Sequence, residues 1–436
     1  MRLAIGVIKK VVRVGVTLIL MPIGLAVALW LAWFAVNIPD RQLTPAAAAL
    51  LAPPPDPVRA SDNLSIALAG FNVPFKGDMK SWGFVTTSIW STAKTHGAEI
   101  TALMARNQEL NQRYLVLHGL HAYFDTDRPG LFRPYGFTTL DAQELFLAET
   151  AARLQAGTPA EQEAALTDLQ QDILMWKVAL DGYGALLSKV LAAISLHADF
   201  LLLGDMVTDP DFDPAPLRSD LDPLLAPFAL QDWTIGRAYP WEMRAAAPVF
   251  EAVARDDYSF LVRSPPPEPW RLRLQDRVSA HFLQLNATEN LEALRMQRLR
   301  ALADGDPDNF IERRDAYRAW SRRQFDAFSH LSWYNPMGRI FVALEPPDDD
   351  YPARVFDVAA FQRLVFLAYQ IRLRCVGSQD IASFMKRHPE WATHPIDAKA
   401  FSWDPGNGTL GVLPVGRAST ERFSLTRVGL SHCRRS

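Results

Sequence analysis

Two histidines and two aspartates form the cluster in this sequence that most resembles a metal site. His118 and His121 are three residues apart, and Asp125 and Asp127 follow within six residues of His121. Histidines at positions i and i+3 of a helix share a face, and carboxylates could complete the coordination of a zinc ion. The usual helix-borne zinc motif, however, spaces its histidines by four and places a glutamate beside the first. Two ordinary histidines near a helix end are therefore the competing interpretation.

Three further patterns contain residues of known functional motifs but lack another residue or element that each motif requires. The acidic stretch 209–220 has proline at the sixth position, where a calcium loop needs glycine. Two Ser-x-x-Lys pairs, beginning at Ser91 and Ser383, have no Lys-Thr-Gly partner in the chain. The Gly-x-Gly-x-x-Gly of residues 406–411 runs into an apolar, proline-containing stretch, whereas a dinucleotide site needs a helix there. The sequence thus predicts no cofactor and leaves the catalytic residues of any enzyme unknown.

The most informative element lies near the N-terminus. Residues 14–38 contain no charged side chain. A helix of this length covers about 37 Å, which is enough to cross a hydrocarbon core of roughly 30 Å. The sequence therefore predicts a transmembrane signal-anchor helix over residues 14–38, which ties the chain to the lipid bilayer.

The flanks of this segment predict its orientation. Residues 1–13 carry four basic residues and no acid, and Trp30, Trp33 and Phe34 gather at the other end, where aromatic rings prefer the membrane interface. Positive flanks stay on the cytoplasmic side. We therefore expect a single-pass protein of the inner membrane with a cytoplasmic tip over residues 1–13 and the bulk of the chain in the periplasm. A cleaved secretory signal is the alternative, since Ala26-Val27-Ala28 has the spacing of a cleavage site.

The remainder of the chain is predicted to be mainly α-helical. Residues 39–62 are rich in proline and alanine and are predicted to form an extended stalk. Residues 63–395 show helical spacing of apolar residues, as in the segment that opens with Thr158-Pro159-Ala160-Glu161. Residues 396–436 contain a strand, an Asn-Gly turn and a second strand. The predicted architecture is a large helical outer domain followed by a small antiparallel β element and tail.

The two cysteines, Cys375 and Cys433, exclude a disulfide-dense scaffold. In an oxidising compartment they could pair and hold the C-terminal tail against the body. The alternative is two unpaired thiols, one buried and one near the end of the chain.

Composition excludes one class of function. The 436 residues are 49% hydrophobic and 21% charged, with a net charge of −3. Beyond the basic tip the chain carries 41 basic and 48 acidic residues, a net charge of −7. A nucleic-acid-binding protein that relies on bulk positive charge is therefore excluded.

Two patches and the overall layout carry a resemblance. The patches are Tyr334-Asn335-Pro336-Met337-Gly338-Arg339 and a C-terminal series of short motifs, His388-Pro389-Glu390, Pro395-Ile396-Asp397 and Phe401-Ser402-Trp403-Asp404. With the predicted span and stalk, the chain resembles uncharacterised single-span, inner-membrane-anchored envelope proteins of Gram-negative bacteria. That resemblance implies a location and no activity.

These observations lead to two hypotheses. The first is a non-enzymatic, membrane-anchored envelope protein with a structural or protein-interaction role, whose partners are envelope proteins. The second is an envelope hydrolase whose best candidates for a metal-dependent site are His118, His121, Asp125 and Asp127.

Overall fold

The computed structural model describes residues 21–54, 58–77, 88–125, 137–255, 280–325, 334–344, 348–416 and 423–425. Over these residues the chain is mainly helical, with one small antiparallel sheet, which confirms the predicted mainly helical class and the small β element. The chain folds into two compact units. Unit 1 comprises residues 1–52, 245–295 and 320–346, and unit 2 comprises residues 53–244, 296–319 and 347–436.

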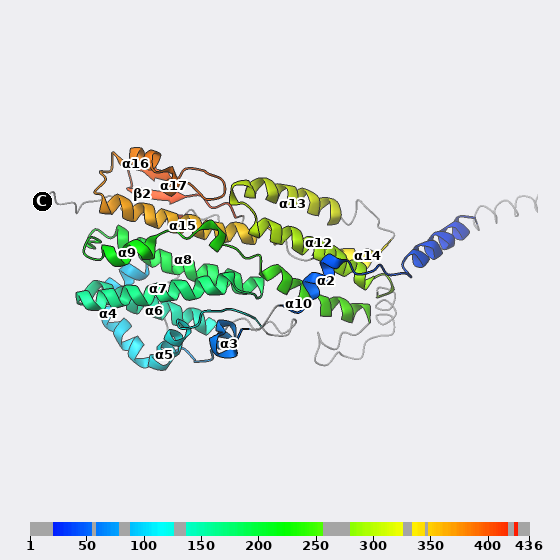
Figure 1. The fold of residues 1–436 in the computed structure, drawn as a ribbon, viewed down its shortest axis with the longest axis horizontal. Coiled ribbons are helices and arrows are strands. Elements are labelled where there is room, and N and C mark those ends of the chain that lie inside the picture. Colours follow the sequence, from blue (N-terminus) through cyan, green and yellow to red (C-terminus); the bar gives the residue numbers. More distant parts are fainter. Residues whose placement is uncertain are drawn as a thin grey trace, which may run out of the picture. The chain divides into compact units, whose positions relative to one another are not determined.

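Unit 2 is built around three long helices. Helices α7 (Pro159–Asp181) and α8 (Leu186–Thr208) run side by side, and α15 (Asp350–Leu373) packs along α8 (Figure 1). Helix α8 is buried on most of its surface because it contacts both neighbours. Its core residues include Leu196, Phe200 and Leu203, all fully buried. The hydrophobic centre of unit 2 therefore lies along α8.

The beginning of α7 shows how the sequence specifies a helix terminus. The Thr158 side chain accepts a hydrogen bond from the backbone N–H of Glu161, and the Glu161 carboxylate accepts one from the backbone N–H of Thr158. Pro159 occupies the first helical position, where its missing N–H costs nothing. The predicted capping box is thereby confirmed.

Further helices of unit 2 cover this centre. Helix α6 packs against α4 and α7, α5 packs against α6, and α9 packs against α7. The helices wholly within unit 2 that complete the bundle are α3 (Leu64–Ala69), α4 (Ile89–Arg106), α5 (Gln108–Leu117), α6 (Phe137–Ala156), α9 (Arg218–Leu225), α16 (Ile381–Arg387) and α17 (Pro389–Ala392), with 3-10 turns at Ala60–Asp62, Leu230–Asp232 and Pro307–Asn309.

The C-terminal β element forms a three-stranded antiparallel sheet of order β1-β2-β3. Strand β1 (Ser402–Asp404) pairs with β2 (Thr409–Val412), and β2 pairs with β3 (Phe423–Leu425). Gly408, at the turn between β1 and β2, has φ of 61°, a left-handed conformation that glycine adopts without steric cost. Leu410 is fully buried, and both β2 and β3 pack on α15. The predicted strand–turn–strand hairpin is confirmed, and β3 adds a third strand to it.

Unit 1 contains the N-terminal helix Met21–Val36, α2 (Pro45–Leu51) and α14 (Pro336–Leu344). It also contains the first half of α12, which spans Leu285–Asp304. Two other helices are divided between the units, namely α10 (Ala238–Ala254) and α13 (Phe310–Phe325).

The segment predicted to be an extended stalk, residues 39–62, has a different structure where it is described. Thr44 caps α2, and Pro45 is its first residue. Ala47 and Leu50 of α2 are buried. The proline-rich composition therefore does not keep this segment extended, because proline at the first position of a helix favours the helix.

One described helix is long and apolar enough, by length and composition, to cross a membrane. It is α8, and 61% of its most apolar stretch is buried within the protein. The N-terminal helix Met21–Val36 is apolar but shorter. The first seven residues of the predicted span 14–38, like the predicted tip 1–13, lie outside the described residues.

Candidate functional site

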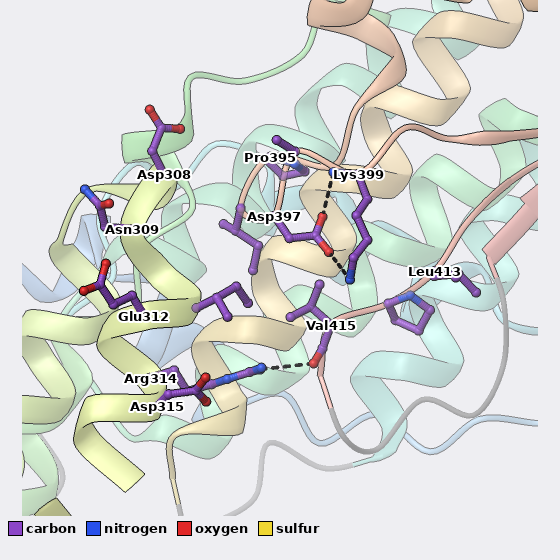
Figure 2. Close-up of a pocket in the computed structure, with 14 residues that line it drawn as sticks. Asp308, Asn309, Glu312, Arg314, Asp315, Pro395, Asp397, Lys399, Leu413 and Val415 are labelled. Carbon is purple, nitrogen blue, oxygen red and sulfur yellow. Dashed lines mark hydrogen bonds and ion pairs between the residues drawn. The ribbon is translucent and has the colours of Figure 1, made fainter. Parts of the chain in front are cut away.

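Unit 2 contains a groove of about 1090 Å³ that is open to solvent (Figure 2). Three segments far apart in the sequence line it: residues 308–315 at the start of α13, residues 395–399, and residues 413–415 after β2. We call it the α13 groove. One of its walls contains the motif Pro395-Ile396-Asp397, but no motif predicted a groove, since no single segment contains more than one wall.

A buried aspartate on α15 holds two of these walls together. The Asp357 carboxylate accepts hydrogen bonds from the backbone N–H groups of Val415, at 2.7 Å, and Gly416, at 3.0 Å. It also contacts Nε2 of His394, at 3.2 Å, in the loop that leads to Asp397. Asp357 and His394 are both almost completely buried. The groove is therefore preformed rather than a loose gap between loops.

The groove contains both engaged and unengaged charges. Lys399 forms an ion pair with Asp397 at 2.8 Å, and Nη1 of Arg314 donates to the carbonyl oxygen of Val415 at 3.1 Å (Figure 2). Three acids that also line the groove are exposed and have no ion-pair partner within the described part of the chain: Asp308, Glu312 and Asp315. Once the Lys399–Asp397 pair is set aside, the groove holds these three acids and the Arg314 guanidinium, so its net charge is negative.

Apolar side chains accompany these acids. Leu413 is 64% exposed at the edge of the groove, and Ile311 and Val415 are half-buried in its wall. An exposed leucine beside unpaired carboxylates suits a ligand that is both cationic and apolar, such as a basic peptide segment.

The metal candidates of the sequence occupy a different part of unit 2. Helix α5 ends at Leu117, so His118 caps the helix and His121 lies beyond it. The two histidines therefore do not share a helix face. The backbone N–H of His121 donates to the Asp62 carboxylate at 3.1 Å, and that of Asp125 donates to the carbonyl oxygen of Tyr183 at 2.8 Å. Asp127 lies outside the described residues.

His118 belongs to a buried polar network between four helices. The Asp172 carboxylate, fully buried on α7, accepts from the Tyr114 hydroxyl at 2.7 Å, contacts Nε2 of His118 at 2.9 Å, and accepts from the Gln143 side chain at 3.2 Å. Gln143 also donates to Asp199 on α8, at 3.0 Å. Burial and the nearby Asp172 raise the pKa of Asp199 well above its usual value. We call these residues the Asp172 network.

This network has the geometry of a structural core. His118 is engaged with Asp172, and the side chains of both are almost completely buried. Among the described residues, no three histidine, cysteine or acidic side chains lie close enough to hold a metal ion. The hydrolase hypothesis therefore gains no support from the described part of the cluster.

A second buried charge lies at the start of α8. The Lys189 side chain is fully buried, donates from Nζ to the carbonyl oxygen of Ala179 at 2.6 Å, and lies 4.4 Å from the centre of the Tyr123 ring. Burial lowers the pKa of Lys189 to about 7, against the opposing effect of Asp181 and Asp125. No motif in the sequence indicates this residue, because its partners Ala179 and Tyr123 come from other segments.

Lys189 should make the stability of unit 2 depend on pH. Between about pH 7 and pH 10 the unfolded chain binds a proton at this lysine that the folded chain does not bind, so the free energy of unfolding should rise with pH. Methionine does not ionise, so the free energy of unfolding of Lys189→Met should not show this rise with pH. Because the variant no longer has to keep an ionisable amine buried, it should also be more stable than wild type at pH 7. Urea unfolding of the detergent-solubilised full chain at pH 7 and pH 9 measures how the free energy of unfolding changes with pH. Lys386→Met, a substitution of an exposed lysine, is the control. Equal pH dependence in Lys189→Met and wild type would contradict the assignment.

The remaining predicted site residues are only partly described. Trp30 is 52% exposed, whereas Trp33 and Phe34 are half-buried because they stack on Phe282 and His281 of unit 1. Cys375 follows the end of α15 with φ of 53°. Cys433 lies outside the described residues, so the pairing of the two cysteines stays a prediction.

Comparison with known proteins adds no family to this description. The chain matches no protein-family model, no curated protein and no solved structure. Its function is therefore argued from its own geometry.

Proposed function

We propose that this is a membrane-anchored binding protein of the bacterial envelope, which holds a partner protein by inserting a basic, partly apolar segment of that partner into the α13 groove. The observation that carries the proposal is the groove itself, a preformed hollow of about 1090 Å³ with three acids that have no described ion-pair partner.

The anchor is supported by the exposure of the N-terminal helix. Over Met21–Val36, all side chains except Trp33 and Phe34 are exposed, although nearly all are apolar. Met21 is 74% exposed and Leu25 is 61% exposed. An apolar helix without protein cover is a membrane-interaction element, because water would otherwise surround it. In the sequence this helix is preceded by the uncharged residues 14–20, and the predicted span of 14–38 would leave the basic tip in the cytoplasm.

The basic character of the partner follows from the charge of the groove. Asp308, Glu312 and Asp315 have no described ion-pair partner, so cationic side chains of a ligand would meet carboxylates that are still solvated. Charge complementarity of this kind sets partner choice and orientation more than affinity. Leu413 and its apolar neighbours would supply the buried contact that affinity needs.

Site-specific photocrosslinking tests this proposal in native membranes. Leu413 is replaced by a photo-crosslinking phenylalanine derivative in the full chain. We expect a discrete adduct, and we expect Glu312→Lys to reduce its yield about tenfold because the variant reverses the charge in the groove. The matched control is Glu163→Lys, an exposed acid of α7 outside the groove.

A second crosslinking position separates specific binding from collision. Val116 of α5 is 69% exposed and does not line the groove. The same adduct from position 116, or an adduct from position 413 that Glu312→Lys leaves unchanged, would overturn the proposal. Absence of any adduct from position 413 would also overturn it.

A further inference from the structure

A second hollow, of about 320 Å³, lies within unit 1. Its walls come from the chain just after the N-terminal helix, from the first half of α12, from the end of α13, and from α14 with the two residues before it. The lining residues are Arg41, Ala287, Asn290, Leu291, Leu294, Gln324, Tyr334, Asn335 and Arg339. We call it the juxtamembrane pocket, and its size is at the lower end of small-ligand sites.

The pocket contains two arginines and no acid among its lining residues. Within the described part of unit 1, no carboxylate forms an ion pair with Arg41 or Arg339. The Arg41 guanidinium lies over the Tyr334 ring, 4.8 Å from its centre, and Nη1 of Arg339 contacts the carbonyl oxygen of Gln324 at 3.4 Å. A guanidinium has five N–H donors, and among the described residues most of the donors of Arg41 and Arg339 have no partner. This chemistry favours a phosphate.

The acids nearest in sequence are already engaged or partly neutral. The Asp40 carboxylate accepts hydrogen bonds from the backbone N–H groups of Asn286, at 2.8 Å, and Ala287, at 3.1 Å, at the start of α12. Burial and the proximity of Glu251 and Asp40 raise the pKa of Glu289 to about 7. Near neutral pH Glu289 is therefore partly protonated and opposes an anion in the pocket less than a fully charged carboxylate would.

The pocket is held in place beside the end of the N-terminal helix. Trp33 stacks on Phe282 with ring centres 4.3 Å apart, and the backbone N–H of Asn335 donates to the Asn37 side chain at 2.7 Å. Arg41 follows Val36 by five residues, so at most about 18 Å of chain separates them. The headgroup region of a bilayer occupies roughly 5–8 Å beyond each side of the hydrocarbon core. The chain turns directly after the helix, because the backbone N–H of Asn37 donates to the carbonyl oxygen of Phe34 at 3.1 Å. A helix embedded up to Val36 therefore keeps Arg41 near the lipid phosphates.

From these contacts we propose that the juxtamembrane pocket binds the phosphate of an anionic glycerophospholipid, with Arg41 and Arg339 as the phosphate ligands. Leu291 and Leu294 line the same pocket and offer apolar contact to the lipid beyond the phosphate. The proposal rests on the membrane anchor proposed above and is independent of the α13 groove.

Native mass spectrometry of the full chain tests the proposal. The protein is reconstituted in bilayers of phosphatidylcholine with one-fifth phosphatidylglycerol, released in mild detergent, and its retained lipids are counted. We expect phosphatidylglycerol to be enriched over its share of the bilayer. Arg41→Gln should lower that enrichment about fivefold, and Arg41→Gln with Arg339→Gln should abolish it. The matched control is Arg322→Gln with Arg323→Gln, two exposed arginines of unit 1 outside the pocket.

The outcomes separate this proposal from its alternatives. If wild type shows no enrichment, or if the control double variant loses the enrichment equally, the juxtamembrane pocket is not the lipid site. Displacement of the lipid by millimolar inorganic phosphate would show a phosphate site without lipid preference and would overturn the lipid assignment. Release of the wild-type chain from membranes by alkaline carbonate would instead refute the anchor. The exposed Arg41 makes Arg41→Gln unlikely to disturb folding, and circular dichroism of each variant verifies this.

Discussion

Asp172→Ala should destabilise unit 2 by about 3–5 kcal/mol, because it removes one carboxylate from several buried partners at once. The Tyr114 hydroxyl, the His118 ring and the Gln143 amide all contact Asp172, and all lie between packed helices where water cannot replace it. A buried polar group that loses its partner retains its full desolvation cost. The midpoint of urea unfolding, followed by circular dichroism in detergent, measures the loss.

The neighbouring Asp199→Asn should behave in the opposite way. Because the folded pKa of Asp199 lies well above the unfolded value, the folded chain binds a proton that the unfolded chain has released once the pH exceeds about 4. The free energy of unfolding of wild type therefore falls as the pH rises because of this aspartate. Asparagine has nearly the same shape but does not ionise, so the variant avoids this loss. We expect Asp199→Asn to be more stable than wild type at pH 8, with a smaller difference at pH 5. A loss of stability in Asp199→Asn as large as in Asp172→Ala would contradict this assignment.

Cys375→Ser with Cys433→Ser should lower the free energy of unfolding by about 4 kcal/mol if the predicted disulfide forms. The two residues would close a loop of about 59 residues, and the chain-entropy model assigns this value to a loop of that length. Reduction of wild type should produce the same loss, and reduction of the double variant should produce none. Thiol titration of the unreduced, denatured chain is the direct measurement, and two free thiols would refute the pairing.

Local signals predicted local structure well. The capping box at Thr158 and the Asn407-Gly408 turn each involve residues within a few positions of one another, so the sequence alone shows them. The helix α2 also had its signal, Thr44 followed by Pro45, but the prolines around it were interpreted as an extended stalk. The stalk prediction was wrong because it relied on the proline content of the whole segment. The structure depends instead on the position of one proline, at the start of the helix.

The sites could not be predicted in the same way. His118 contacts Asp172, 54 residues away, and this contact decides that the histidine belongs to the core. Asp357 joins the walls of the α13 groove through His394 and Val415, 37 and 58 residues away. Such partners are set by helix packing, and no spacing rule connects them. Arg41 and Arg339 are separated still further along the chain.

The contact between Asn37 and Asn335 also constrains how the protein is made. These residues are 298 positions apart, and one donates its backbone N–H to the side chain of the other. A ribosome that adds about 5–20 residues per second needs roughly 15–60 s to synthesise the intervening chain. During that time the N-terminal helix has already emerged, while the segments that complete unit 1 do not yet exist. A chain terminated before Asn335 would therefore contain the anchor but never close the unit that follows it.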